Sequence, residues 1–283
     1  MFMNDMKQFC IVIPIYKKEL DCIEEISINS IKRVIGKKNY DIYFVCPESL
    51  DITNYLKILP KAKEKRFADK FFESTATYSR LCVSYDFYNT FSEYEYMIIY
   101  QLDCYLFRDE FKQWCDKGYD YIGGTIISTD CGWDTVKKNR GNVYQPYVGN
   151  GGFSLRKIET FKDICDPNGE LRTTYKITDE ILDQIKWEDK FFCNDLYEIY
   201  KLDIPFWKEA LEFSMDMSVD VLYNQFKWQG TPMALHAWDK NIRWWKKVLP
   251  ELIDNKEVSD YCEKKHEEFF KLYYAENDSS FRQ

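Results

Sequence analysis

The sequence lacks several features that would assign a protein to a class at once. It contains no CxxC pair, and its nearest cysteines, Cys104 and Cys115, are eleven positions apart, which excludes the usual cysteine-rich zinc and redox motifs. No stretch approaches the roughly 20 apolar residues that a membrane-spanning helix needs, and the start of the chain lacks the apolar region of a signal peptide. Several cysteines lie within apolar runs, as free thiols do. We therefore expect a protein of the reducing cytoplasm.

A basic stripe is also absent. Lys and Arg number 39 and Asp and Glu number 47, so the formal net charge is −8. A protein that follows a phosphate backbone needs Lys and Arg clustered on one face, and the sequence therefore disfavours a nucleic-acid partner. With 45% hydrophobic and 18% aromatic residues, the chain can bury a sizeable globular core.

Strands and helices alternate at the beginning of the chain. Residues 9–16 and 40–48 are apolar, β-branched runs, which predict buried strands. Residues 20–35 carry apolar side chains at three- and four-residue spacing, which predicts a helix that Gly36 ends. This order is a βαβ unit and indicates an α/β protein.

The next elements repeat the pattern. Residues 75–91 predict a second helix, and residues 96–103 predict a further strand that ends at a single aspartate, Asp103. In open parallel sheets, ligands bind at the carboxyl ends of the strands. Asp103 is therefore a candidate ligand-binding residue.

The middle of the chain is rich in glycine, with eight of the eleven glycines between Gly118 and Gly152. The polar segment from Thr125 to Pro146 is long enough for a lid that a donor orders, although a mobile surface connection would read the same way. In residues 147–157, YVGNGGFSLRK, glycines flank Asn150 and let the backbone approach a ligand, and we expect a helix from Arg156. The spacing matches neither the P-loop nor the GxGxxG fingerprint.

Two later stretches carry further candidates. Glu188 and Asp189 open a predicted helix with an apolar face of Phe191, Phe192, Leu196 and Ile199, where an acidic pair is also favoured by the helix dipole alone. His236 follows an apolar strand and precedes Trp238. It is one of two histidines, and a satisfied surface or core histidine is the alternative; His266, in a charged C-terminal helix, fits that alternative.

Taken in this order, the segments resemble glycosyltransferases of the GT-A type. The resemblance rests on IIYQLDCYLF, YDYIGG, VGNGGFSLRK and WEDKFF within residues 8–240, and is greatest to an uncharacterised bacterial glycosyltransferase-like group with QxD in place of DxD. It implies a GT-A domain at 1–240, with a Rossmann-like mixed sheet flanked by helices, and a helical extension at 241–283.

The resemblance also implies an activity. It predicts transfer of a sugar, with inversion, from a nucleotide-diphosphate donor such as a UDP-sugar to a hydroxyl of a glycan, glycoprotein or lipid-linked acceptor. Asp103 and His236 would hold a divalent cation, and an imidazole ligand favours Mn²⁺ over Mg²⁺. Gln101 stands where DxD enzymes carry the first aspartate, so one of the two carboxylates expected at the metal is missing.

Roles for the other residues follow from the same resemblance. Asp189 would be the general base that takes the proton of the acceptor hydroxyl, and Glu188 would bind acceptor hydroxyls. The residues expected at the nucleotide are Pro14, Ile15, Tyr16, Tyr78, Ser79, Arg80, Gln101 and Asp103. Those expected at the sugar or acceptor are Asn150, Gly151, Gly152, Phe153, Trp187 and Glu188.

Three alternatives stay open at the level of sequence. The missing aspartate of DxD suits a non-catalytic sugar-binding module on a degenerate GT-A fold. A sugar nucleotidyltransferase shares the α/β layout, but residues 14–21 lack the glycine-rich loop that it normally has. Trp244 and Trp245, next to two lysines, could contact the inner face of a membrane or pack against the catalytic domain.

Overall fold

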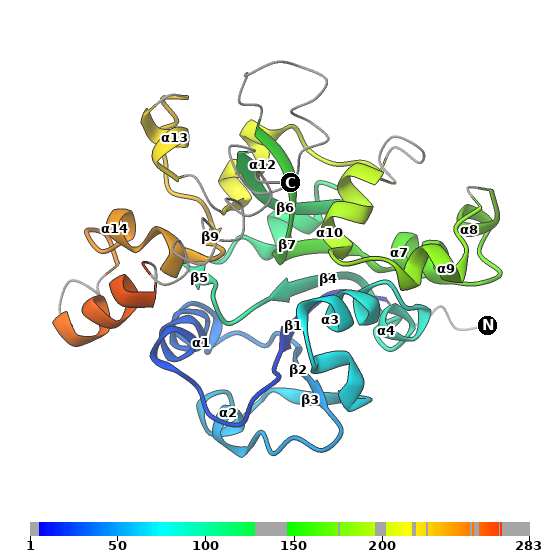
Figure 1. Ribbon diagram of the computed structural model, residues 1–283, viewed down its shortest axis with the longest axis horizontal. Helices are drawn as coiled ribbons and strands as arrows, with labels where there is room; N and C mark the ends of the chain where they lie inside the picture. The colour runs from blue at the N-terminus through cyan, green and yellow to red at the C-terminus, as the bar shows by residue number, and fades with distance from the viewer. Residues whose placement is uncertain are drawn as a thin grey trace, which may run out of the picture.

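The computed structural model describes residues 6–127, 146–174, 176–195, 202–216, 219–224, 226–249, 251, 255–265 and 267. These residues form a nine-stranded mixed sheet in the order β3-β2-β1-β4-β7-β6-β8-β9-β5. The strands are β1 (Lys7–Pro14), β2 (Ile42–Pro47), β3 (Lys63–Phe67), β4 (Tyr94–Tyr100), β5 (Tyr105–Leu106), β6 (Tyr121–Ile127), β7 (Pro146–Lys157), β8 (Ser214–Met215) and β9 (Ala234–Leu235). In Figure 1, β4 lies between the amino-terminal strands β1–β3 and the later strands β6 and β7.

The amino-terminal strands form the parallel part of the sheet. β1 pairs in parallel with β2 and β4, and β2 pairs in parallel with β3. Ile11 and Ile13 of β1 belong to the hydrophobic cluster on one face, whereas Cys10 and Val12 belong to the cluster on the other. Successive side chains of a strand point to opposite faces, so β1 is apolar throughout because both faces are covered. The predicted βαβ unit is confirmed.

The connecting helix α1 (Cys22–Ile35) begins at a capping box. The carboxylate of Asp21 accepts hydrogen bonds from the backbone N–H groups of Ile23 and Glu24, and the carboxylate of Glu24 accepts one from the N–H of Asp21. Such a cap typically stabilises a helix by about 1 kcal/mol. It also places both carboxylates just beyond the end of β1.

The remaining helices cover the two faces of the sheet and its far end. On the first two faces lie α2 (Thr53–Ile58), η1 (Asp69–Phe72), α3 (Thr75–Cys82), α4 (Tyr85–Asn89), α5 (Phe111–Cys115), α7 (Ile158–Cys165), α8 (Glu170–Thr174), α9 (Asp179–Asp183), α10 (Glu188–Lys190) and the π-helix η2 (Phe191–Asp195). Toward the far end lie α12 (Trp207–Phe213), α13 (Val219–Asn224), η3 (Trp238–Asn241), α14 (Ile242–Trp245) and a helix at 256–265. Among the residues described, no helix combines the length and apolar character needed to cross a membrane.

The later strands are arranged differently. β7 runs antiparallel to both β4 and β6. The pairing of β6 with β7 is irregular, because Gly123 pairs with Ser154 while the next residue, Gly124, pairs with Asn150. Residues 151–153 of β7 therefore have no partner in β6, and such bulges bend a strand and re-aim its residues.

Two sequence predictions need correction here, and others fall outside the described residues. The helix expected over 75–91 is two helices, since the Ser84 hydroxyl caps α4 after α3 has ended at Cys82. Arg156 continues β7, paired with Met97 and Tyr121, so the helix begins at Ile158. Most of the predicted lid at 125–146, namely residues 128–145, lies outside the described residues, as do Leu196, Ile199 and His266.

The two tryptophans near the carboxyl end pack inward. Trp245 is 3% exposed, and the Trp244 ring stacks on Tyr223 with centroids 4.9 Å apart. Cys262, in the helix at 256–265, shares their hydrophobic cluster with Ile23 of α1. The packing alternative therefore accounts for this aromatic pair.

Candidate active site

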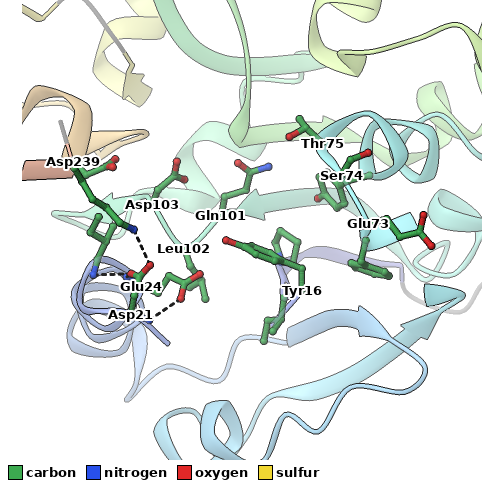
Figure 2. A pocket seen from close by; sticks show the side chains of 16 residues that line it. Tyr16, Asp21, Glu24, Glu73, Ser74, Thr75, Gln101, Leu102, Asp103 and Asp239 are labelled. Atoms are coloured by element: carbon green, nitrogen blue, oxygen red, sulfur yellow. Dashed lines mark hydrogen bonds and ion pairs between the residues drawn. The ribbon is translucent and has the colours of Figure 1, made fainter. Parts of the chain in front are cut away.

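A cavity of about 500 Å³ lies at the carboxyl ends of β1 and β4 (Figure 2). Its position follows from the parallel pairing of these strands, which brings their ends to the same edge of the sheet. The lining residues are Pro14, Ile15, Tyr16, Asp21, Ile23, Glu24, Phe72, Glu73, Ser74, Thr75, Tyr78, Gln101, Leu102, Asp103, Asp239 and Lys265. Segments from the start, middle and end of the chain thus meet in one cavity.

His236 joins the cavity edge to the sheet. Its Nε2 lies 3.3 Å from Asp103 Oδ1 and 3.4 Å from Gln101 Oε1, and its Nδ1 lies 3.1 Å from Asp216 Oδ1. The other oxygen of Asp216 accepts a hydrogen bond of 3.0 Å from Asn150 Nδ2. The imidazole is therefore held between two carboxylates, with Asp216 on the buried side and Asp103 on the cavity side.

Electrostatics favour the charged forms of this group. Burial disfavours an imidazolium, but the carboxylates of Asp103 and Asp216 outweigh it and raise the pKa of His236 to about 10. Burial likewise opposes ionisation of Asp103, but the adjacent imidazolium lowers the pKa of Asp103 to about 2. Asp103 is thus an anion at neutral pH.

The donor set suits a divalent cation only in part. Asp103 Oδ1 is buried and takes no hydrogen bond, which leaves an acceptor directed at the His236 ring. A Cβ at Gly152 would lie 2.1 Å from His236 Nε2 and 2.8 Å from Gln101 Oε1, so only glycine leaves this space open. No cluster of three or more Asp, Glu, His or Cys side chains suited to a metal occurs among the described residues. Asp103 and His236 could therefore supply two ligands, with the cation replacing the proton on His236 Nε2 and the other ligands coming from substrate and water.

A second charged group, formed by Arg156, Glu188 and Asp189, lies against Gly151, the residue before Gly152. Arg156 Nη2 donates to Glu188 Oε1 at 2.9 Å, and the Ser79 hydroxyl donates to Glu188 Oε2 at 2.8 Å. Asp189, next in the chain, accepts a 3.0 Å hydrogen bond from the Gly151 N–H at Oδ2. Burial, followed by the nearby Glu188 carboxylate, raises the pKa of Asp189 to about 7, which is the range that suits a general base.

Six of the eight residues expected at the nucleotide line the cavity: Pro14, Ile15, Tyr16, Tyr78, Gln101 and Asp103. The other two lie elsewhere. Ser79 binds Glu188, and Arg80 donates to the Asp183 carbonyl beside a second cavity. The two aromatic residues expected at the sugar differ in exposure. Phe153 is fully buried in the core, whereas Trp187 is 50% exposed.

Comparison with known proteins identifies the family of this chain. The model of the family described as Protein of unknown function (DUF5672) matches residues 61–236. The chain belongs to this family. A search of curated protein sequences found no match.

Solved structures with a similar fold identify the fold of this DUF5672 member. Mouse xyloside xylosyltransferase 1, in its apo form, is 14% identical with a TM-score of 0.57, covering 81% of this chain and 97% of the mouse chain. The galactosyltransferase LgtC, in complex with donor and acceptor sugar analogs, is 11% identical with a TM-score of 0.51, covering 80% of this chain and 86% of LgtC. The predicted GT-A fold is confirmed.

Sequence reasoning missed three residues of this candidate site. Asp216 directly follows the short strand β8, so it carried the same signal as Asp103, an aspartate after an apolar strand. Asp239 lines the cavity near Asp103, with Oδ1 buried and without a hydrogen bond; burial, then the Asp103 carboxylate, raise its pKa. Arg156 had no local signal, since only the fold shows that it is buried.

Proposed function

We propose that this protein is a glycosyltransferase that moves a sugar from a nucleotide-diphosphate donor, a UDP-sugar, to a hydroxyl of a glycan, glycoprotein or lipid-linked acceptor. The observation that carries the proposal is the Asp103–His236 pair beside a 500 Å³ cavity at the carboxyl ends of β1 and β4 in a GT-A fold. The LgtC structure, which holds donor and acceptor sugar analogs, supports the substrate class.

The charge of the cavity supports a cation-dependent donor site. Asp21 and Glu24 are paired with Lys17, and Asp21 also with Lys265. Asp103 and Asp239 face the same cavity. A bound cation would offset the repulsion between these two carboxylates and a donor diphosphate.

Asp103 and His236 would hold that cation, Mn²⁺ in preference to Mg²⁺ because one ligand is an imidazole. A bound cation would offset the charge that develops on the departing nucleoside diphosphate. The nucleoside would lie on Pro14, Ile15 and Tyr16, at the end of β1, where Tyr78 also lines the cavity. Gln101 replaces a second carboxylate, so this site relies on one direct anionic ligand.

Asp189 would be the general base. Its carboxylate would take the proton of the acceptor hydroxyl while the acceptor oxygen bonds to the anomeric carbon and the bond to the diphosphate breaks, which inverts that carbon. The raised pKa and the Gly151 hydrogen bond support this assignment. The exposed Trp187 beside it could stack on an acceptor sugar.

The setting of the reaction is part of the proposal. We place the protein in the cytoplasm, because the nine cysteines among the described residues are free thiols, eight of them buried. Contact with the inner face of a membrane would need a surface other than Trp244 and Trp245, whose rings are packed against the protein.

A screen of nucleotide-sugars tests the function. A ligand that binds only the folded state stabilises it by about 2.7 kcal/mol at 100 times its Kd, so one UDP-sugar should raise the melting temperature with Mn²⁺ and not with EDTA. The stabilising donor is then offered with glycan acceptors, and transfer is followed by mass spectrometry. Binding without hydrolysis or transfer would favour a non-catalytic sugar-binding module, and no stabilisation by any nucleotide-sugar would contradict the proposal.

A further inference from the structure

Arg156 is a charged residue in the interior of the protein. It is 0% exposed, on β7, and its guanidinium lies 5.6 Å from the centre of the Tyr121 ring. Its Nε donates to Ser154 at 3.2 Å and its Nη1 donates to the Tyr88 hydroxyl at 3.0 Å, besides the contact of Nη2 with Glu188. A buried charge is retained only when it is paired and hydrogen-bonded, and these contacts meet that condition.

Glu188 is equally enclosed. It is 6% exposed, and each of its oxygens already accepts a hydrogen bond, one from Arg156 and one from Ser79 of α3. Because so little of Glu188 is exposed, an acceptor sugar has almost no open surface by which to reach it. The acceptor-binding role that the sequence suggested for Glu188 therefore does not suit its surroundings.

The ion pair packs directly under the backbone that holds Asp189. A Cβ added to Gly151 would lie 2.7 Å from Glu188 Oε1 and 3.0 Å from Arg156 Nη2, so the pair occupies the space beside this glycine. The N–H of Gly151 donates to Asp189. One buried pair thus fixes two supports of Asp189: the strand residue that binds its carboxylate and the helix residue that precedes it.

We propose that Arg156, Glu188 and Ser79 form a positioning unit that holds Asp189 in place and sets the charge around it. The proposal rests on the function proposed above, in which Asp189 is the base. Arg156 and Glu188 act through Asp189 and need not touch substrate. A carboxylate beside a guanidinium in a dry interior keeps its geometry, because breaking the pair would leave an unpaired buried charge.

The field at Asp189 has identifiable sources. From α10 it faces the Glu188 carboxylate, from β7 the Arg156 guanidinium, from β6 the Tyr121 hydroxyl and from η2 the Cys193 thiol. Burial raises the pKa values of Tyr121 and Cys193 well above their usual ranges, so both are neutral near pH 7. Among the described residues, the charged side chains that act on Asp189 are therefore Glu188 and Arg156, which have opposite sign.

Direct titration of Asp189 tests the unit without any enzyme assay. The ¹³C resonance of the Asp189 side-chain carboxyl is followed against pH in the full chain and assigned by its loss in Asp189→Asn. Glu188→Gln keeps the shape of the side chain and removes the like charge, so the pKa of Asp189 should fall by about one pH unit or more.

A matched control separates this effect from general destabilisation. Arg172→Met removes another buried arginine, one that binds the carbonyls of Cys165 and Ile177 and the carboxylate of Asp179. It should lower the melting temperature and leave the Asp189 titration unchanged. An unchanged titration in folded Glu188→Gln would overturn the proposal.

Transfer kinetics provide the second readout. Glu188→Gln should lower kcat by about 10²-fold through misplacement of Asp189, with the acceptor KM unchanged. A raised acceptor KM at unchanged kcat would return Glu188 to acceptor binding and overturn the proposal. If the parent protein transfers no sugar, the proposed function fails, whereas the titration still decides whether Glu188 and Arg156 set the charge at Asp189.

Two further variants guard against misfolding. Arg156→Lys keeps the positive charge and cannot span Ser154, Tyr88 and Glu188 together, so it should retain the Asp189 pKa and lose part of kcat. If Glu188→Gln does not fold, the double variant with Arg156→Met replaces the pair by neutral side chains. It should bind UDP and Mn²⁺ as the parent does and lose kcat; a parent-like kcat would overturn the proposal.

Discussion

Gly151 and Gly152 are neighbours on β7, yet one lies beside a buried charged group and the other beside a charged group that faces a cavity. At Gly152, His236 and Asp103 stand at the edge of a cavity, the Asp103 side chain is 30% exposed, and its Oδ1 takes no hydrogen bond. At Gly151, Arg156 is fully buried, and each Glu188 oxygen has a donor. A partly exposed carboxylate beside a cavity can bind a ligand, whereas a closed network holds other residues in place.

The largest difference should come from Asp103. Asp103→Asn removes the negative charge that contacts His236 from the cavity side, so stabilisation by UDP plus Mn²⁺ should be abolished in thermal unfolding. The fold should persist, as circular dichroism would show, because this side chain is partly exposed. Unchanged UDP affinity and metal dependence in this variant would place the donor elsewhere.

Asp189→Asn should act on the chemical step alone. The amide keeps the shape of the side chain but cannot take a proton, an effect typically worth about 10²–10⁴-fold in kcat, and donor binding should match the parent. Product stereochemistry, read by NMR at the new anomeric centre, checks the same role. Retention would rule out a single displacement assisted by Asp189.

The pH dependence of the parent sharpens this test. The pKa of Asp189 is raised to about 7, so the carboxyl is protonated, and inactive as a base, at lower pH. The value of kcat should therefore fall about tenfold for each pH unit below 7 and level off above it. Asp189→Asn should lose this limb of the profile, and a limb that persists would assign it to another group.

The two glycines offer a matched pair of substitutions. Gly152→Ala would place a Cβ 2.1 Å from His236 Nε2, whereas Gly151→Ala would place one 2.7 Å from Glu188 Oε1. Each should cost about 1–3 kcal/mol of stability through overpacking. Gly152→Ala should lose Mn²⁺-dependent nucleotide binding. Gly151→Ala should keep nucleotide binding and lose sugar transfer. Equal loss of binding in both would dissolve the distinction between the two groups.

The smallest effect on metal binding should come from Asp216, which contacts His236 Nδ1 on the side away from the cavity. Partners that orient metal-binding histidines typically contribute 10–100-fold in metal affinity, and Asp216→Asn, which keeps the shape, should lose about tenfold. Titration of Mn²⁺ followed by electron paramagnetic resonance measures this without turnover. The control is Asp41→Asn, since Asp41 pairs with Lys7 and Lys63 away from the site; equal losses in the two variants would remove Asp216 from the site.

Local pattern was sufficient for part of this molecule. Buried parallel strands are continuous apolar runs and a covered helix repeats every three to four residues, so β1, α1, β2 and β4 could be predicted from short windows. The position of Asp103 at the cavity followed, because a strand end is a local feature and parallel strands share a ligand-binding edge. His236 after its apolar strand was accessible in the same way.

Other features had no local signature. Arg156 reads like the start of a helix and lies in a strand because Met97 and Tyr121, far away in sequence, pair with it. The sequence by itself determined which residues could bear charge at strand ends and helix starts. Only the tertiary structure decided which of those charges meet an open cavity, as at Asp103, and which are closed off, as at Glu188. Burial and pairing depend on contacts between segments more than 30 residues apart, such as Glu188 with Ser79 and Arg156.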